Sequence, residues 1–309
     1  MPSNNSRQAL SDAAARQLST TTKTVPQMQA ITPRWLVRML QWQPVEAGVF
    51  RVNRVKDAAA IDVACGHKDE GTLPETFVDF ETKPREYTLS MISTVLGVHT
   101  RVSDLFNAPI DQVREQLRLT VEAVKERQED QLINNADYGL LNQVAAGQRI
   151  STRKGPPTPD DMDELISKVW KEPAFFLAHP RAIAAFGREC TRRGVPPPTA
   201  TLFGNAFLTW RGLPLIPCDK LHIKGGKDEG GKTNILLMRV GKDKQGVTGL
   251  FQPNLQGEQT PGLSVRFMGI NNHAVATYLV TLYCSAAVLT DDALAVLENV
   301  DVGNYYDYK

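Results

Sequence analysis

The sequence predicts an α+β fold, and three features lead to this prediction. A helical pattern runs from Pro109 to Asn135, which is longer than most helices of globular proteins. Helical and strand-like segments then follow one another from Thr158 to Asp219. Strand-like runs dominate the remainder as far as Leu289. A chain that mixes helices and strands in this way is predicted to be α+β.

The composition is that of a soluble globular protein of about two domains. Of the 309 residues, 42% are hydrophobic and 22% are charged, which is enough apolar material for a sizeable core. The 35 basic and 34 acidic residues give a formal net charge of +1. Nothing in this balance indicates a nucleic acid or a membrane surface as a partner.

The N-terminus and the cysteines indicate a cytoplasmic protein. The first residues lack the charged start and apolar run of a signal peptide. The longest uncharged stretch, Ala274–Leu289, is shorter than the roughly 20 residues of a membrane-spanning helix. The four cysteines are far apart and form no CxxC pair: Cys65, Cys190, Cys218 and Cys284. We expect reduced thiols and no metal site.

Residues 1–44 are predicted to form an N-terminal arm that ends in an anchor helix. The arm is polar up to ITPRWLVRMLQW, where Thr32 can cap a short helix with Pro33 at its first position. The anchor candidates on one face of this helix are Trp35, Leu36 and Leu40. We expect them to pack across a subunit boundary, and docking on the arm's own subunit is the alternative that the residues leave open.

Residues 45–88 are predicted to form an extended hairpin loop, called the hairpin arm below. VEAGVFRVNRV, residues 45–55, alternates as a strand does, and TFVDFET, residues 76–82, is a second strand-like run. A polar, turn-rich insert of roughly 20 residues separates them. Such an arm is too thin to have a core, so contact with something else must stabilise it.

The long helical segment is predicted to be a helix over residues 111–134. Asn107 can cap its start, and Pro109 lies near its first turn. Apolar residues recur along one face at helical spacing: Ile110, Val113, Leu117, Val121 and Val124. A long helix with one apolar face is expected to lie on a sheet.

Residues 158–269 are predicted to form a second compact region. Thr158 can cap a helix that has Pro159 at its first position and several carboxylates in its first turn. The apolar stripe of this helix consists of Met162, Leu165, Ile166, Val169 and Trp170. A strand in PAFFLAHP, a helix in RAIAAFGREC and strands in LFGNAFLTWRGLPLIPCD follow.

No stretch of the chain predicts an enzyme site. GKDEGGKT, residues 226–233, formally matches the phosphate-binding GxxxxGK[ST] loop, but a strand-like run follows where that loop needs a helix. We interpret it as a hairpin loop and keep a nucleotide-binding enzyme as an alternative. Helix capping accounts for the carboxylates Asp160, Asp161, Asp163 and Glu164. We therefore predict no catalytic, cofactor-binding or metal-binding residue.

Two stretches resemble the major-capsid fold of tailed phages, the Hong Kong 97 (HK97-like) type. FFLAHPRAIAAF with LTWRGLPLIPCD is similar to its axial domain, and ATYLVTLYCSAAVLTDDALAV is similar to its long terminal strand and acidic turn. The resemblance implies an N-terminal arm, an extended hairpin loop (E-loop), a spine helix in a peripheral domain, and an axial domain. We expect residues 89–157 and 270–309 in the peripheral domain and residues 158–269 in the axial domain.

Longer segments resemble the family 2 encapsulins, the shells of bacterial nanocompartments. These segments are TKTVPQMQAITPRWLVRMLQWQPVEAGVFRVNRV, ETKPREYTLSMISTVLGVHTRVSDL, RRGVPPP and GLFQPNLQGEQTPGLSVRF. The match covers nearly the whole chain. Because 309 residues leave no room for the cyclic-nucleotide-binding domain of some members, the chain resembles branch 2A, which lacks it.

This resemblance implies a structural protein without catalytic activity or cofactor, whose copies close into an icosahedral shell of sixty subunits, arranged as twelve pentamers. The implied cargo is a cysteine desulfurase, a pyridoxal-phosphate enzyme that converts cysteine to alanine and leaves persulfide sulfur for sulfur metabolism or storage. No cargo-contacting residue follows from the resemblance. A phage capsid protein that packages DNA is the alternative, although the short arm before Trp35 leaves no room for a scaffolding region of the usual size.

In the capsid fold, the loop after the axial-domain helix gathers around the five-fold axis, and residues 191–199 correspond to it here. The candidate pore residues are Arg192, Arg193, Gly194, Val195, Pro196, Pro197 and Pro198. Three consecutive prolines would stiffen the rim, and the arginines would favour anionic or zwitterionic small molecules. Pairing of both arginines with carboxylates of a neighbouring subunit is the alternative.

Overall fold

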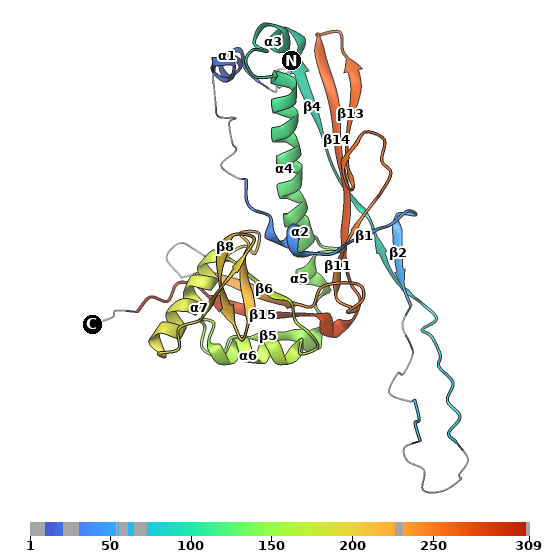
Figure 1. The fold of residues 1–309 in the computed structure, drawn as a ribbon, viewed down its shortest axis with the longest axis vertical. Helices are drawn as coiled ribbons and strands as arrows, with labels where there is room; N and C mark the ends of the chain where they lie inside the picture. Colours follow the sequence, from blue (N-terminus) through green and yellow to red (C-terminus); the bar gives the residue numbers. More distant parts are fainter. Residues whose placement is uncertain are drawn as a thin grey trace.

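The computed structural model describes residues 10–20, 31–53, 55, 61–64, 73–225 and 231–306. These residues form two bodies and one projecting arm (Figure 1). A tall body contains the long helix and a sheet of long strands, and a compact body lies beside its foot. The hairpin arm extends from the lower end of the tall body, away from its long strands. The mixture of helices and strands confirms the predicted α+β class.

The tall body is a six-stranded sheet with the long helix α4 (Gln112–Asn134) along one face. Its strands are β1 (Trp42–Pro44), β4 (Ser90–His99), β11 (Val247–Phe251), β12 (Glu258–Thr260), β13 (Leu263–Ile270) and β14 (Val275–Val288). β14 is central, because β4 pairs with it on one side while β11 and β13 share its other side. Two short helices, α1 (Asp12–Thr20) and α3 (Thr100–Leu105), lie at the far end of α4 (Figure 1).

The start of α4 differs slightly from the prediction. The helix begins at Gln112, and its cap is Asp111, whose side chain accepts a hydrogen bond from the Arg114 N–H at 2.9 Å. Asn107, the predicted cap, accepts from the Gln112 N–H at 3.1 Å and so also satisfies a free donor of the first turn. Pro109 precedes the helix and lies near its first turn, as predicted.

The face that α4 turns toward the rest of the subunit is more polar than the apolar stripe predicted. Of that stripe only Val124 is buried, whereas Val113, Leu117 and Val121 remain half-buried. The buried residues of α4 are Gln112, Glu115, Gln116, Val124, Gln128, Glu129, Leu132 and Ile133. The predicted stripe therefore lies at the edge of the contact with the sheet, not at its centre.

The compact body is a seven-stranded mixed sheet with the order β5-β15-β10-β6-β9-β8-β7. Its strands are β5 (Arg149–Ser151), β6 (Phe175–Ala178), β7 (Thr199–Leu202), β8 (Asn205–Trp210), β9 (Leu213–Pro217), β10 (Lys232–Met238) and β15 (Leu294–Asp301). Its helices are α2 (Trp35–Met39), α5 (Leu140–Gln143), α6 (Pro159–Lys168) and α7 (Pro180–Arg192). Two one-turn helices, Ala146–Gln148 and Asp291–Ala293, precede β5 and β15.

Helices cover both faces of the compact sheet. Phe176 and Leu237 point to the face that α6 and α7 cover, and they belong to one apolar cluster with those helices. Phe175 and Leu236 point the other way, into a cluster with α2, α5 and the C-terminal end of α4. Since neighbouring side chains of a strand alternate between faces, this sheet needs cover on both sides.

The start of α6 is confirmed as predicted. The Thr158 hydroxyl accepts from the Asp161 N–H at 3.2 Å, and an Asp161 carboxylate oxygen accepts from the Thr158 N–H at 3.0 Å. This reciprocal pair is a capping box with Pro159 at the first helical position. Trp170 was wrongly placed in the apolar stripe: the helix ends at Lys168, and the Trp170 side chain is exposed.

The predicted boundaries between the two domains are wrong at two places. The strands between 247 and 270 were assigned to the axial domain, but they belong to the tall sheet. The segment after residue 290 was assigned to the peripheral domain, but β15 lies within the compact sheet, between β10 and β5. Strand pairing joins segments that are remote in sequence, so local patterns show strands but not their partners.

The GKDEGGKT stretch does not have the surroundings of a phosphate-binding loop. Residues 226–230 lie outside the described part of the chain, but the residues just before the stretch and those at its end, 231–233, are described. The backbone groups of Lys224 and Lys232 exchange two hydrogen bonds of 2.7 Å, and Lys232 begins strand β10. A strand follows where the phosphate loop needs a helix, as the hairpin interpretation predicted.

The hairpin arm is paired differently from the prediction. β2 (Val49–Val52) pairs antiparallel with β3 (Arg85–Thr88), so the second strand lies beyond the predicted run 76–82. Within that run the described pairing is a single bridge between Val55 and Phe80. The base of the arm packs on the tall sheet, where the Tyr87 hydroxyl donates to the Val288 carbonyl at 2.5 Å.

A cluster of charged side chains attaches the N-terminal arm to α4. Glu126 accepts hydrogen bonds from the backbone N–H of Thr32 at 2.8 Å and from the Arg34 guanidinium at 3.0 Å. The Lys220 ammonium lies 3.0 Å from the same carboxylate. Thr32 therefore does not cap α2 as predicted. Burial alone would raise the pKa of Glu126, but the hydrogen bonds of Thr32 and Lys220 and the Lys220 charge hold it below its ordinary value.

Glu129, one turn further along α4, takes over the capping of α2. Its carboxylate accepts from the Leu36 N–H at 2.9 Å, which satisfies a free donor at the start of that helix. The side chain is buried, and this burial raises its pKa to about 7, although the Leu36 N–H and the charge of Lys220 oppose the rise. Glu126 and Asp219 add to the rise through their negative charges.

We expect Glu129→Gln to become more stable relative to wild type as the pH rises. Because the folded pKa lies above the unfolded one, the stabilisation from Glu129 is complete below about pH 4.5 and is lost as the pH passes 7. Glutamine keeps an acceptor for the Leu36 N–H and does not titrate. Thermal unfolding midpoints at pH 5 and pH 8 measure the effect, with exposed Glu172→Gln as the matched control. If the difference in unfolding midpoint between Glu129→Gln and wild type is the same at both pH values, the prediction is contradicted.

Candidate assembly surfaces and pore loop

The predicted anchor of the N-terminal arm lies in the core of its own subunit. Trp35, Leu36 and Leu40 are 7%, 0% and 5% exposed and belong to the cluster that covers the compact sheet. Trp35 also packs edge-on against Phe207 with ring centres 5.3 Å apart. The prediction that these side chains cross a subunit boundary is corrected, because they have no exposed apolar surface to offer a neighbour. A truncation of residues 1–40 would open the core itself.

The hairpin arm carries apolar side chains that its own chain does not cover. Phe77 is 88% exposed, and Leu73 and Val63 are 75% and 72% exposed. In the same segment, Val78 is 50% exposed and Phe80 is 60% exposed. Carboxylates alternate with these side chains at Glu75, Asp79 and Glu81. Clustered exposed apolar side chains of this kind indicate an interaction surface.

A second exposed apolar patch lies on the tall sheet. Met91, Val95 and Met268 are each more than half exposed. Val95 pairs with Leu279 and Met91 with Tyr283 of β14, so these two side chains point to one face, while Met268 lies at an irregularity of the neighbouring strand β13. This face is opposite to α4, because the α4 cluster contains the alternate β14 residues Val280 and Leu282.

The candidate pore loop lies at the end of α7, and most of it is exposed. α7 ends at Arg192, and residues 193–198 lead into β7. Pro197 is half-buried, and the other candidate pore residues are exposed: Arg192, Arg193, Gly194, Val195, Pro196 and Pro198. The loop is therefore a surface feature of the compact body.

The two arginines of this loop pair with carboxylates of their own subunit. The Arg192 guanidinium lies 2.8 Å from the buried Glu189 carboxylate, and that of Arg193 lies 3.5 Å from it and 3.4 Å from Asp160. Both arginines therefore have carboxylate partners without the neighbouring subunit that the alternative interpretation requires. Glu189 could not be recognised from the sequence as a partner of the loop, because it lies inside the helix and no local pattern marks it.

The C-terminal tail also contacts Glu189 and Arg192. The Tyr306 hydroxyl donates to Glu189, and the Arg192 guanidinium lies 5.1 Å from the centre of the Tyr306 ring. Burial alone would raise the pKa of Glu189, but the hydrogen bonds of Arg192 and Tyr306, with the charge of Arg193, hold it below its ordinary value. Arg192 and Arg193 thus lie beside two carboxylates, Glu189 and Asp160, and these four side chains have no net formal charge.

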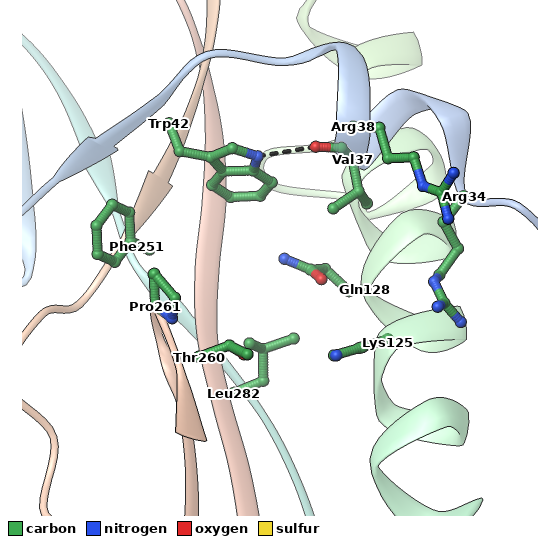
Figure 2. A pocket seen from close by; sticks show the side chains of 10 residues that line it. All are labelled: Arg34, Val37, Arg38, Trp42, Lys125, Gln128, Phe251, Thr260, Pro261 and Leu282. Carbon is green, nitrogen blue, oxygen red and sulfur yellow. Dashed lines mark hydrogen bonds between the residues drawn. The ribbon is translucent and has the colours of Figure 1, made fainter. Parts of the chain in front are cut away.

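A groove lies between α2, α4 and the tall sheet (Figure 2). Its volume is about 380 Å³, and the indole N–H of Trp42 at its upper wall donates to the Val37 carbonyl at 2.9 Å. The remaining lining residues are Arg34, Arg38, Lys125, Gln128, Phe251, Thr260, Pro261 and Leu282. A second hollow of about 540 Å³ continues along α4 and shares Lys125 and Thr260 with the first.

The described cysteines are buried free thiols: Cys190, Cys218 and Cys284. Burial raises the pKa of Cys190 to about 11 and that of Cys284 to about 12, so both are unreactive thiols. Cys65 lies outside the described residues. Cys218 comes near Glu129 and Asp219, a grouping that could suit a metal ion. Because the Lys220 ammonium already lies 2.7 Å from Asp219, we assign no metal site there.

In the part of the chain that the structure describes, none of the helices has the length and apolar character needed to cross a membrane.

Comparison with known proteins gives a consistent result. The family model described as "Type 2A encapsulin shell protein SrpI-like" matches residues 48–304. The type 2A encapsulin shell protein SrpI of Synechococcus elongatus is 67% identical over 309 residues, which is 100% of this chain and 99% of that protein.

Solved structures show the same similarity. The cryo-electron microscopy structure of the holo-SrpI encapsulin complex from Synechococcus elongatus PCC 7942 has a TM-score of 0.85 and 64% identity, covering 97% of this chain and 99% of that one. The capsid of a native GTA particle has a TM-score of 0.61 at 15% identity, covering 91% and 94%. At that identity the likeness shows the fold alone, and it confirms the HK97-like capsid fold.

Proposed function

This chain belongs to the type 2A encapsulin shell proteins, and we propose that sixty copies of it close into an icosahedral shell that encloses a cysteine desulfurase in the bacterial cytoplasm. The chain itself is a structural shell protein and not an enzyme, as its relatives are named. The pyridoxal phosphate of the reaction belongs to the enclosed enzyme. The chain needs no cofactor for this role.

The observation that carries the shell proposal is the hairpin arm. Its base is held by the tall sheet, but Leu73, Phe77 and Phe80 beyond the base are 75%, 88% and 60% exposed. A two-stranded arm cannot bury such side chains by itself. A second copy of the chain supplies the missing surface, and the exposed patch formed by Met91, Val95 and Met268 has the matching apolar character.

A phage capsid function has less support. The likeness to phage-type capsids rests on a shared fold at about 15% identity, whereas the shell-protein relatives are 59–67% identical over nearly the whole chain. A nucleotide-binding enzyme has less support still, because strand β10 begins at Lys232.

The desulfurase is proposed as cargo because the chain resembles the branch that encloses this enzyme. The similar solved structure is named as a holo-SrpI encapsulin complex. A shell around this enzyme must admit cysteine and release alanine. We place this passage at the loop of residues 192–198, gathered around the five-fold axis.

We expect the purified protein to elute as a particle of roughly 2 MDa, sixty copies of 34.2 kDa, seen as uniform hollow spheres by electron microscopy. Phe77→Ser with Phe80→Ser should leave the subunit folded but abolish closed shells or reduce them several-fold, because the arm loses the apolar surface that a neighbour covers. Lys83→Ser, an exposed change in the same arm, is the matched control. Closed shells at wild-type yield from the double variant would contradict the role of the arm.

Shells isolated from the native host should contain a cysteine desulfurase. Mass spectrometry should identify the enzyme, the particles should show the absorbance of pyridoxal phosphate, and they should release sulfide from cysteine in the presence of a thiol reductant. Intact shells that hold some other protein, with none of these signals, would contradict the cargo proposal but not the shell proposal.

A series of charge variants tests the pore loop. Counting Arg192, Arg193, Glu189 and Asp160, wild type has no net charge per subunit at the loop, Glu189→Gln has one positive charge, and Glu189→Gln with Arg192→Gln and Arg193→Gln has one negative charge. Uptake of a small anionic fluorophore by intact shells should be fastest in Glu189→Gln and slowest in the triple variant, and a cationic fluorophore should show the reverse order. High salt should reduce both differences. Equal uptake rates across the series would rule out this loop as the electrostatic gate.

A further inference from the structure

The C-terminal tail, residues 303–306, lies along α7 and is attached to it by polar contacts. Strand β15 ends at Asp301, and Val302 still belongs to the apolar cluster that α7 covers. The Arg188 guanidinium of α7 donates to the Val302 carbonyl at 3.0 Å and to the Asn304 carbonyl at 2.9 Å. These two hydrogen bonds direct the chain toward the last turn of α7, where the candidate pore loop begins.

The two oxygens of the Glu189 carboxylate have different partners. Oε2 lies 2.8 Å from the Arg192 guanidinium and 3.5 Å from that of Arg193. Oε1 accepts the hydrogen bond of the Tyr306 hydroxyl, and the Tyr306 ring lies against the Arg192 guanidinium. Because Glu189 is buried, an oxygen that loses its donor is not easily satisfied by water instead. Among the described residues, Tyr306 thus satisfies the oxygen that both arginines leave free.

The other ionisable groups around Glu189 belong to α6 and α7. Asp160 of α6 lies 3.4 Å from the Arg193 guanidinium. The neighbouring Cys190 thiol is neutral near pH 7, because burial raises its pKa to about 11. The hydrogen bond to Glu189 raises the pKa of Tyr306 as well, so its hydroxyl keeps its proton. Glu189 is therefore the buried group of this cluster whose charge can change in mildly acidic solution.

The charge of Glu189 decides the net charge of the candidate pore loop. While Glu189 is ionised, it and Asp160 offset both arginines, whereas a protonated Glu189 leaves one positive charge per subunit. Burial acts to raise the pKa of Glu189, and the hydrogen bonds of Arg192 and Tyr306 act against it. Loss of the Tyr306 hydroxyl therefore raises this pKa, and the loop becomes positive at a higher pH than in wild type.

We propose that Tyr306 is a positioning residue of the passage: its hydroxyl holds one oxygen of Glu189, so that the carboxylate stays in place as the counter-charge of Arg192 and Arg193. This inference rests on the proposed function, because it requires that the loop lines an opening of the shell. The rim then carries no net charge, which suits the zwitterions cysteine and alanine. The C-terminal tail thereby becomes part of the passage.

The test measures uptake by intact full-length shells of two fluorophores with fixed charge, one sulfonated and one a quaternary ammonium compound. Tyr306→Phe keeps the ring beside Arg192 and removes only the hydroxyl. Its anion-to-cation uptake ratio should equal that of wild type at pH 7.5 and exceed it by about two-fold or more at pH 5, because Glu189 binds a proton more readily. Tyr305→Phe makes the same chemical change on the next residue, which is 76% exposed, and should match wild type at both pH values.

Two further variants connect this pH dependence to Glu189 and to the tail. Glu189→Gln has the extra positive charge at every pH, so its uptake ratio should be high at both pH values and should not change when Tyr306→Phe is added. Arg188→Lys keeps the charge but lacks the planar fork that reaches both carbonyls of the tail. It should shift the ratio at pH 5 in the same direction as Tyr306→Phe, by a smaller factor.

The outcomes separate this inference from the proposed passage. A high ratio in Glu189→Gln together with a wild-type pH profile in Tyr306→Phe would overturn the role of Tyr306 and leave the passage in place. An unchanged ratio in Glu189→Gln would overturn the passage at this loop, and this inference with it. Electron cryo-microscopy checks that the shells are closed at both pH values, and a wild-type map with Tyr306 away from Glu189 would also overturn the inference.

Discussion

The structure depends on one constraint: the compact sheet has two apolar faces, and the helices α6 and α7 cover only one of them. Its other face is covered by α2 of the N-terminal arm, by α5 and by the last turns of α4. Leu36, Leu132 and Ile133 are fully buried there. Because α4 also lies on the tall sheet through Val124, one rigid helix holds the two bodies in a defined arrangement.

Two carboxylates of α4, Glu126 and Glu129, also hold this junction, and their charges are compensated to different degrees. Buried charges destabilise a fold unless partners compensate for the lost water. Glu126 has such partners in Arg34 and Lys220, and hydrogen bonds from Thr32 and Lys220 hold its pKa below its ordinary value against the effect of burial. Glu129 has the backbone N–H of Leu36 but no direct cation among the described residues, so its pKa is raised to about 7. The attachment of the arm thus contains one carboxylate that is half-ionised near neutral pH.

The two faces of the tall sheet carry different elements. One face carries the base of the hairpin arm and the exposed side chains of Met91 and Val95, which suits contact between copies. The other face carries α4 and the hollows beside it. The candidate pore loop belongs to the compact body, where Glu189 and the C-terminal tail contact its arginines. The surface proposed for contact between copies and the loop proposed for passage are therefore separate.

The sequence by itself determined the elements whose formation depends on neighbouring residues: the long helix, the Thr158 capping box and most strands, because helix periodicity and capping are local interactions. Its long segments also identified the family. Only the tertiary structure decided which strands pair, as for β15 in the compact sheet and β3 in the hairpin arm. It likewise decided that Trp35 is buried in its own subunit and that Glu189 pairs with the arginines of the candidate pore loop. These outcomes depend on contacts between residues far apart in the chain, which no local pattern encodes.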